Sequence, residues 1–110
     1  MTAESIRRTK AYKKIKASLI DQLERSGNDT PYFLDLVHDY MKLYETKELA
    51  AADVAARGVT IFSIGSAGQE VSKKNDSVDM LIKINAQMLK LLDQLRIKAD
   101  IVTTDEDDEL

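Results

Sequence analysis

The sequence predicts a mainly α-helical domain of about three to four helices, with a short β-hairpin before a long C-terminal helix and with oligomerisation through helix packing. Three observations predict it. Charged residues make up 32% of the chain and aromatic residues 5%, a balance that favours packed helices over a β-sandwich. Apolar residues recur at helical spacing in long stretches. One β-branched stretch, followed by Gly65-Ser66-Ala67-Gly68, interrupts them.

The length of 110 residues suits one small domain, which we place at residues 1–98. Every residue from Asp105 to Glu109 is acidic, so we expect residues 99–110 to be a disordered acidic tail with little apolar surface to bury. The chain has no cysteine, which excludes disulfides and thiolate metal sites. No apolar run approaches the length of a membrane span or a signal-peptide core, so we expect a soluble cytoplasmic protein without membrane contact or cofactor.

Residues 5–25 form the first predicted helix. Its apolar face consists of Tyr12, Ile15, Leu19 and Leu23. Its N-terminal half is strongly basic, with six Lys or Arg residues and no acid between Arg7 and Lys16. The helical period places Arg7, Lys10 and Lys14 on the outer face, Lys13 beside them, and Arg8 and Lys16 at the borders of the apolar face. Ser26-Gly27-Asn28 ends the helix.

The basic half of this helix predicts contact with double-stranded DNA, because clustered Lys and Arg side chains bind nucleic acid by neutralising phosphates. No aromatic residue lies among the basic side chains, so backbone contact with a duplex is favoured over base stacking on a single strand. The candidate DNA-binding residues are Arg7, Arg8, Lys10, Lys13, Lys14 and Lys16. The alternative interpretation is a solvated helix face, because basic clusters are common on protein surfaces.

Residues 31–57 are predicted to be helical, and Thr30-Pro31 is a typical helix start. The apolar residues near its beginning, Phe33, Val37, Tyr40 and Tyr44, make this segment the expected core partner of the C-terminal helix. Gly58 is expected to cap the alanine-rich stretch from Lys47 to Arg57. This stretch either belongs to a separate short helix starting at Thr46 or follows a bend of the preceding helix at that point.

Asp35, His38 and Asp39 share the outer face of this second region. Carboxylate and imidazole groups at these offsets are compatible with a metal site, but a charged outer helix face has the same pattern. No further ligands lie nearby in the sequence, so we favour the solvated face and predict no metal. His38 is the only histidine, and we identify no nucleophile that it would activate.

The pattern of residues 59–72 predicts a hairpin between the helices. Val59 to Ile64 is β-branched and aromatic, Gly65 to Gly68 suits a turn, and Gln69 to Ser72 suits a returning strand. The glycines do not form a phosphate-binding loop, because the Gly-Lys-Ser/Thr ending of that motif is absent. Since an isolated hairpin is only marginally stable in water, we expect it to pack on the helices or on another subunit.

Apolar spacing over residues 75–97 predicts a long helix. Its heptad seam, the stripe whose residues are spaced by three and four, consists of Leu81, Ile84, Met88, Leu91 and Leu95. A second apolar stripe lies one residue over and contains Val78, Ile82, Leu89 and Leu92. The two stripes make a face wide enough to pack on the chain's own helices and on a neighbouring subunit. Asn85 interrupts the second stripe, either fixing a register between helices or lying as a tolerated amide at the edge of a core.

The order of these features resembles a known protein family. A basic first helix precedes the stretch Tyr-Phe-Leu-Asp-Leu-Val-His-Asp-Tyr at residues 32–40 and a Leu-Ala-rich helix. Gly58 then leads into a hairpin of the form Gly-Ser-x-Gly-x-Glu-Val, and a leucine-rich helix over residues 87–95 follows. Over residues 12–97 the chain resembles the small terminase subunits of tailed bacteriophages and prophages, specifically the P27-type family.

The resemblance implies a non-catalytic protein of viral genome packaging in the host cell cytoplasm. Such proteins recognise viral DNA, assemble into rings, and recruit or regulate a large terminase subunit that carries the ATPase and the nuclease. Two other functions fit the residues: a helical transcriptional regulator or nucleoid-type DNA binder, and a structural helical interaction module. An enzyme fits least, because the sequence shows no catalytic group of residues.

Overall fold

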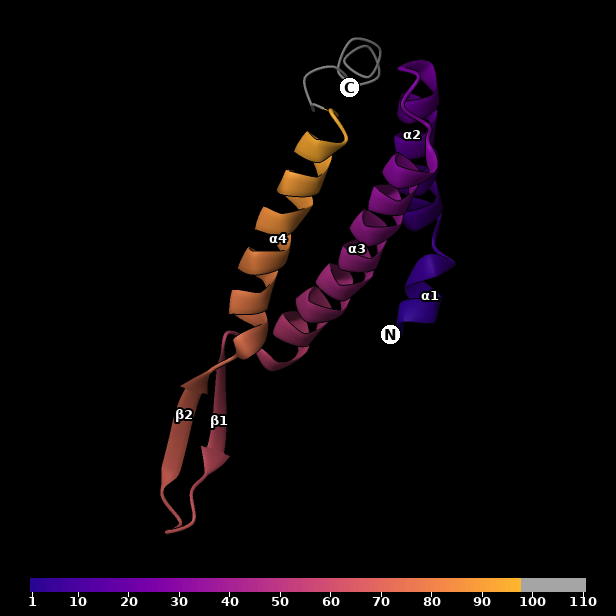
Figure 1. Cartoon of the computed structure of the whole chain (residues 1–110). Coiled ribbons are helices and arrows are strands. Elements are labelled where there is room, and N and C mark those ends of the chain that lie inside the picture. The colour runs from indigo at the N-terminus through magenta and orange to yellow at the C-terminus, as the bar shows by residue number, and fades with distance from the viewer. Residues whose placement is uncertain (98–110) are drawn as a thin grey trace, which may run out of the picture.

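The computed structural model describes residues 1–97, and the elements follow the predicted order (Figure 1). They are α1 (Ala3–Arg7), α2 (Lys10–Arg25), α3 (Pro31–Arg57), β1 (Thr60–Ile64), β2 (Glu70–Lys74) and α4 (Asp76–Gln94). Helix α3 runs through the middle of the molecule, with α4 along one side and α1 and α2 along the other. The predicted helical class, the hairpin and the long C-terminal helix are therefore confirmed, and oligomerisation through helix packing stays a prediction. The predicted acidic tail at 99–110 lies outside the described residues.

The single helix predicted at residues 5–25 is wrong, because the chain breaks at Thr9 into α1 and α2. The Thr9 hydroxyl donates to the Ile6 carbonyl at 2.7 Å and accepts from the Tyr12 amide at 3.2 Å. A threonine in this position caps a new helix instead of continuing the old one. The break turns α1 so that Ile6 is buried in the core beside α3.

Helix α3 is continuous over 27 residues, so the alternative of a separate short helix from Thr46 is excluded. The Thr46 hydroxyl bonds back to the Lys42 carbonyl at 3.2 Å within the same helix and starts no new one. Pro31 occupies the first turn, where its missing N–H is not needed. The helix ends at Gly58, whose φ of 81° lies in the left-handed region that favours glycine.

The hydrophobic core lies where α2 and α4 cover α3. Its buried residues come from every helix: Ile6, Tyr12, Leu19, Leu23, Val37, Met41, Tyr44, Ile84, Met88 and Leu95. Three of the five seam residues predicted in the last helix, Ile84, Met88 and Leu95, are among them, and Leu81 and Leu91 are half-buried. The heptad seam is therefore part of the chain's own core.

Helix α4 ends at Gln94, three residues before the predicted end, and Arg96 adopts a positive φ of 61°. The Ile97 amide donates to the Leu92 carbonyl at 2.9 Å, and the Arg96 amide donates to the Asp93 carbonyl at 3.0 Å. The hydrogen bond from Ile97 to Leu92 closes a turn of six residues, as in a Schellman motif. Arg96 occupies the position of this motif where glycine is commoner. This cap folds Ile97 back against the core.

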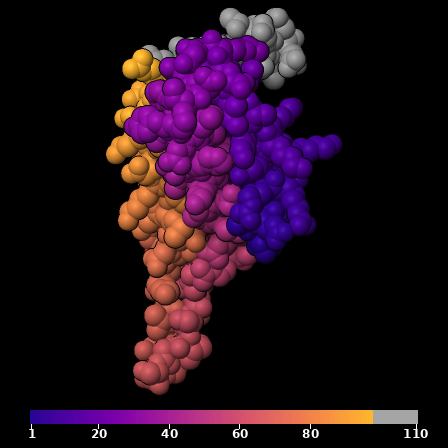
Figure 2. All heavy atoms as spheres, turned by 45° about the vertical axis from the view of Figure 1, so that its right-hand side comes forward, coloured from indigo at the N-terminus to yellow at the C-terminus, as the bar shows by residue number. Residues whose placement is uncertain are grey.

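The hairpin pairs Thr60 with Lys74 and Ile64 with Glu70, so β2 runs two residues beyond the predicted end at 72. We call residues 59–74 the arm. The arm extends away from the end of the helices, and none of its residues is buried (Figures 1 and 2). The chain's own helices therefore do not provide the packing that the sequence led us to expect for the hairpin.

Asn75 joins the arm to the helices and is fully buried. Its side-chain amide donates to the Gly58 carbonyl at 2.9 Å, while its side-chain oxygen accepts from the Ser77 amide at 2.9 Å. The Ser77 hydroxyl donates to Asp53 at 2.7 Å, and Arg57 donates two further bonds to the same carboxylate. These hydrogen bonds, first those from Arg57, hold the pKa of Asp53 well below its usual range.

We predict that Met88→Asp unfolds the chain, because an unpaired carboxylate in the core costs several kcal/mol of a total stability of roughly 5–15 kcal/mol. Gln87→Asp is the control, since Gln87 is exposed one residue earlier on the same helix. Thermal melting followed by circular dichroism measures both. Equal melting temperatures for the two variants would show that the seam is not the core.

We predict that Asn75→Ala lowers the unfolding free energy by about 1–3 kcal/mol, because the Gly58 carbonyl and the Ser77 amide each lose a hydrogen-bond partner. Asn85→Ala is the matched control: it removes an exposed amide from the same helix and should change stability by about 0.5 kcal/mol or less. Urea unfolding gives both values. Asn75→Ala must be clearly the less stable of the two.

Candidate nucleic-acid interface

The six predicted DNA-binding residues lie on the N-terminal segment, from the end of α1 to the middle of α2. This segment lies on the side of α3 away from α4 and forms its own ridge on the surface (Figures 1 and 2). The structure divides the six residues into two groups. The two arginines are engaged in ion pairs, whereas the lysines at the start of α2 project from the ridge.

Arg7 points toward α3 and contacts Glu45, with Nη1 2.9 Å from Oε1. The side chain of Glu45 is buried, with only 12% of it exposed, whereas that of Arg7 is 49% exposed. Arg7 therefore supplies the positive charge that a buried carboxylate needs. Tyr12 packs nearby, and burial, followed by the negative charge of Glu45, raises the pKa of its phenol. The predicted basic outer face of Arg7, Lys10 and Lys14 is therefore interrupted, because Arg7 forms an ion pair that holds α1 against α3.

Arg8 pairs with Glu4 one turn earlier in α1, at 2.6 Å between Nη2 and Oε1. Both side chains are largely exposed, so this ion pair contributes little to stability and dissociates at little cost. Arg8 is thus more available to another anion than Arg7 is. Lys16 is half-buried.

Lys10, Lys13 and Lys14 are all exposed, and the ion pairs formed within residues 1–97 involve none of them. We call these three residues the lysine cluster. Helical spacing of three and four residues puts Lys10 next to Lys13 and Lys14 on the surface of α2. The cluster is the part of the predicted site that the structure leaves free to bind a ligand.

The lysine cluster stands at the positive end of its helix. Helix α2 has no acidic residue in its first turn, although acids are the residues that stabilise a helix start. Neighbouring like charges on a helix cost a few tenths of a kcal/mol each, and the helix dipole adds to that cost. An anion placed against the cluster removes both penalties. The cluster is therefore suited to a phosphate group, which the free amides of a helix start also favour.

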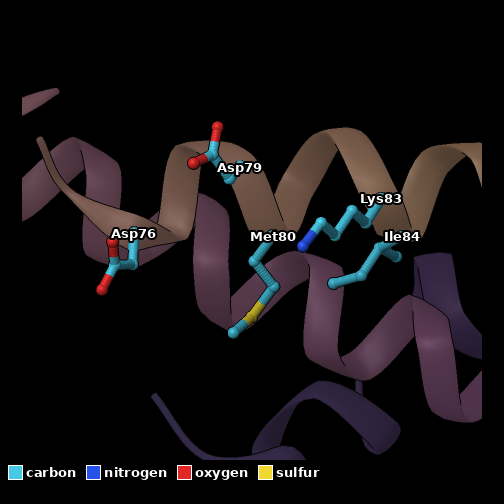
Figure 3. A pocket seen from close by; sticks show the side chains of 5 residues that line it. All are labelled: Asp76, Asp79, Met80, Lys83 and Ile84. Atoms are coloured by element: carbon cyan, nitrogen blue, oxygen red, sulfur yellow. The ribbon is translucent and has the colours of Figure 1, made fainter.

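Other candidate sites on the described part of the chain have less support. Asp35, His38 and Asp39 are exposed on α3 as a charged outer face, and residues 1–97 contain no group of three acidic or histidine side chains arranged to hold a metal. A shallow open hollow beside the start of α4 is lined by Asp76, Asp79, Met80, Lys83 and Ile84 (Figure 3). Asp79 in this hollow is paired with Lys74 at 2.7 Å.

Within residues 1–97, the helices are too short or too polar to cross a membrane. A family model described as "Phage terminase, small subunit" matches residues 11–98, which is most of the chain. The chain belongs to the phage terminase small-subunit family. Membership of this family assigns the chain a role in phage DNA packaging, and small terminase subunits are generally non-catalytic. Comparisons with curated proteins and with solved structures found no match.

The family match begins at residue 11, so it covers nearly all of α2, α3, the arm and α4 but leaves out α1. The Arg7–Glu45 pair that holds α1 in place was missed by sequence reasoning. One signal was present: Glu45 follows Tyr44 directly in the core-facing part of α3. An acid at such a position needs a basic partner from another element.

We predict that Arg7→Ala lowers the unfolding free energy by about 1–3 kcal/mol, a value between those of exposed and fully buried ion pairs. Arg8→Ala removes the same charge from the neighbouring residue and should cost less than about 1 kcal/mol. Urea unfolding of both variants tests the difference. The double variant Arg7→Ala/Glu45→Gln should recover most of the loss, because no unpaired charge remains; no recovery would contradict a role for the pair.

Proposed function

We propose that the chain is a non-catalytic DNA-binding subunit that recognises viral DNA and recruits or regulates the large terminase subunit, the ATPase and nuclease of genome packaging. Two observations support this proposal: membership of the terminase small-subunit family, and the lysine cluster exposed at the start of α2. The cluster carries the DNA-binding part of the proposal, because three exposed lysines that pair with no acid within residues 1–97 can neutralise phosphates.

The proposed contact is with the phosphates of double-stranded DNA. Lysine is a flexible point charge that suits phosphate contact better than base recognition, and the cluster includes no aromatic side chain for stacking. Arg8 joins this contact when its exposed pair with Glu4 opens. Arg7 contributes indirectly by holding α1 against α3.

We further propose that the subunit acts as a homo-oligomeric ring. Each copy then presents one lysine cluster, and contacts that are weak singly add together through avidity. The same arrangement provides repeated surfaces on which the large terminase subunit can be recruited. The oligomer also explains the second apolar stripe of α4, which the chain's own core leaves largely exposed.

We predict that replacing Lys10, Lys13 and Lys14 together by Ala weakens binding to duplex DNA across sequences without changing the mass of the protein particle. Each phosphate that the protein no longer neutralises should reduce the slope of log affinity against log salt concentration by about 0.9. A salt titration of DNA affinity by fluorescence anisotropy, with light scattering in parallel, measures both effects. Arg7 is left unchanged, because its replacement would disturb the fold.

Two controls accompany this measurement. Replacing the same three residues by Arg keeps the charges and should keep the affinity and the salt slope. Lys42→Ala, which removes an exposed lysine from α3, should leave both nearly unchanged, whereas Lys14→Ala alone should lower both. Identical titrations for wild type and the triple alanine variant would refute the lysine cluster as the DNA contact.

A further inference from the structure

Helix α4 exposes an apolar stripe that no part of the described chain covers. Ile82 is 65% exposed and Leu89 is 59% exposed, and Val78 lies half-buried on the same side of the helix. We call Val78, Ile82 and Leu89 the outer stripe. Leu92, the fourth member of the predicted second stripe, packs partly against the core. Apolar side chains repeated at helical spacing and left in water indicate a surface for another protein.

The arm exposes a second apolar surface. The strand register places Phe62 opposite Ser72 and Ile64 opposite Glu70, and residues two apart in a strand share a face. Phe62 and Ile64 therefore project from the same side of the arm, where they are 65% and 73% exposed. A two-stranded hairpin with an exposed apolar face is only marginally stable in water. We therefore expect this face to be a second protein-binding surface.

The two surfaces cannot cover each other within one chain. The arm extends from the junction of β2 with α4 in one direction, and α4 runs from that junction in the opposite direction (Figure 1). Three hydrogen bonds of Asn75 fix this arrangement: the two with Gly58 and Ser77, and one that its backbone N–H donates to the Val59 carbonyl at 2.9 Å. A second copy of the chain offers both surfaces at once, each free to meet the other.

The apolar face of the arm fits within the outer stripe. From Phe62 to Ile64 the strand takes two steps of 3.3 Å and spans about 7 Å. From Ile82 to Leu89 the helix takes seven steps of 1.5 Å and spans about 11 Å. Both apolar side chains of the arm face can therefore meet exposed apolar side chains of α4 in one contact.

The charges at the edges of the two surfaces are also complementary. Helical spacing places Lys83, Lys90 and Asp93 along the solvent side of the outer stripe, where all three are exposed. Asp79 lies on the same side but is paired with Lys74. The border therefore carries one net positive charge from the three residues that form no ion pair within residues 1–97. Glu70 is the only acidic residue of the arm and lies opposite Ile64 on its apolar face. Contact between the two surfaces brings the acid of the arm face against a border of net positive charge, which favours this pairing.

We propose that the arm of one copy packs its Phe62–Ile64 face on the outer stripe of α4 in the next copy. The contact is heterologous, since it joins two different surfaces, and repeated contacts of this type close into a ring when the rotation allows it. The inference rests on the proposed homo-oligomer and names the residues that hold it together. It also accounts for the buried Asn75 network, which positions the arm to reach outward.

Cysteine cross-linking tests the pairing directly, because the wild-type chain contains no cysteine. The full-length double variant Phe62→Cys/Ile82→Cys, treated with a short bismaleimide, should give a ladder of covalently linked subunits. Phe62→Cys alone and Ile82→Cys alone should remain single chains on a denaturing gel. Covalent dimers from either single variant would overturn the proposal, because they would show contact between two identical surfaces.

Substitutions in the two surfaces give a second readout. Ile82→Asp should shift the mass measured by light scattering toward that of one 12.4 kDa chain while the helical circular-dichroism signal at room temperature stays that of wild type. Tyr32→Asp is the control, because Tyr32 is equally exposed but lies outside both surfaces. Glu70→Lys should weaken assembly, and Lys83→Glu with Lys90→Glu in the same chain should restore it. A wild-type mass of one chain, or equal masses for Ile82→Asp and wild type, would refute the contact.

Failure of this inference is distinguishable from failure of the proposed DNA contact. If Ile82→Asp keeps the wild-type mass while the triple lysine variant loses DNA affinity, the arm contact is wrong and the DNA contact stands. If Ile82→Asp dissociates the particle and the triple lysine variant binds DNA like wild type, the reverse holds.

Discussion

The packing of α4 against α3 is the constraint on which the rest of the structure depends. The two helices pack through their apolar faces. The seam of α4 contributes Ile84, Met88 and Leu95 to the buried core. Because the two helices are antiparallel, the end of α3 and the start of α4 come together at Gly58 and Asn75. The residues that connect the two helices form the arm, which extends beyond the ends of both helices.

The N-terminal segment shows how a small change in local structure divides one group of charges into two roles. Thr9 breaks the helix, which directs Arg7 inward to Glu45 and leaves Lys10, Lys13 and Lys14 at the start of a new helix. The inward arginine stabilises the fold, whereas the lysines raise the positive potential at a helix end that is already positive. Basic residues that look equivalent in the sequence are thus not equivalent in the structure.

The proposed surfaces lie on different parts of the molecule. The lysine cluster is on the side of α3 away from α4, the outer stripe is on α4, and the arm projects beyond the end of both helices (Figure 1). DNA binding and subunit contact therefore do not compete for the same residues. In the proposed ring, each new subunit adds another lysine cluster while it buries apolar surface that a single chain exposes to water.

The sequence by itself determined the helical fold class, the order of the elements, the hairpin and the seam of α4, because apolar periodicity and turn residues are local signals. It also located the basic segment. Only the tertiary structure decided that residues 5–25 form two helices, that Arg7 is held by Glu45, and that the arm stands free of the helices. The helix break depends on local hydrogen bonds of Thr9 that the apolar pattern does not show. Arg7 is held by a partner 38 residues away. The burial of one α4 stripe instead of the other depends on how α4 packs on α3. A one-dimensional pattern shows that two stripes exist, but the burial of one and the exposure of the other are properties of the packed molecule.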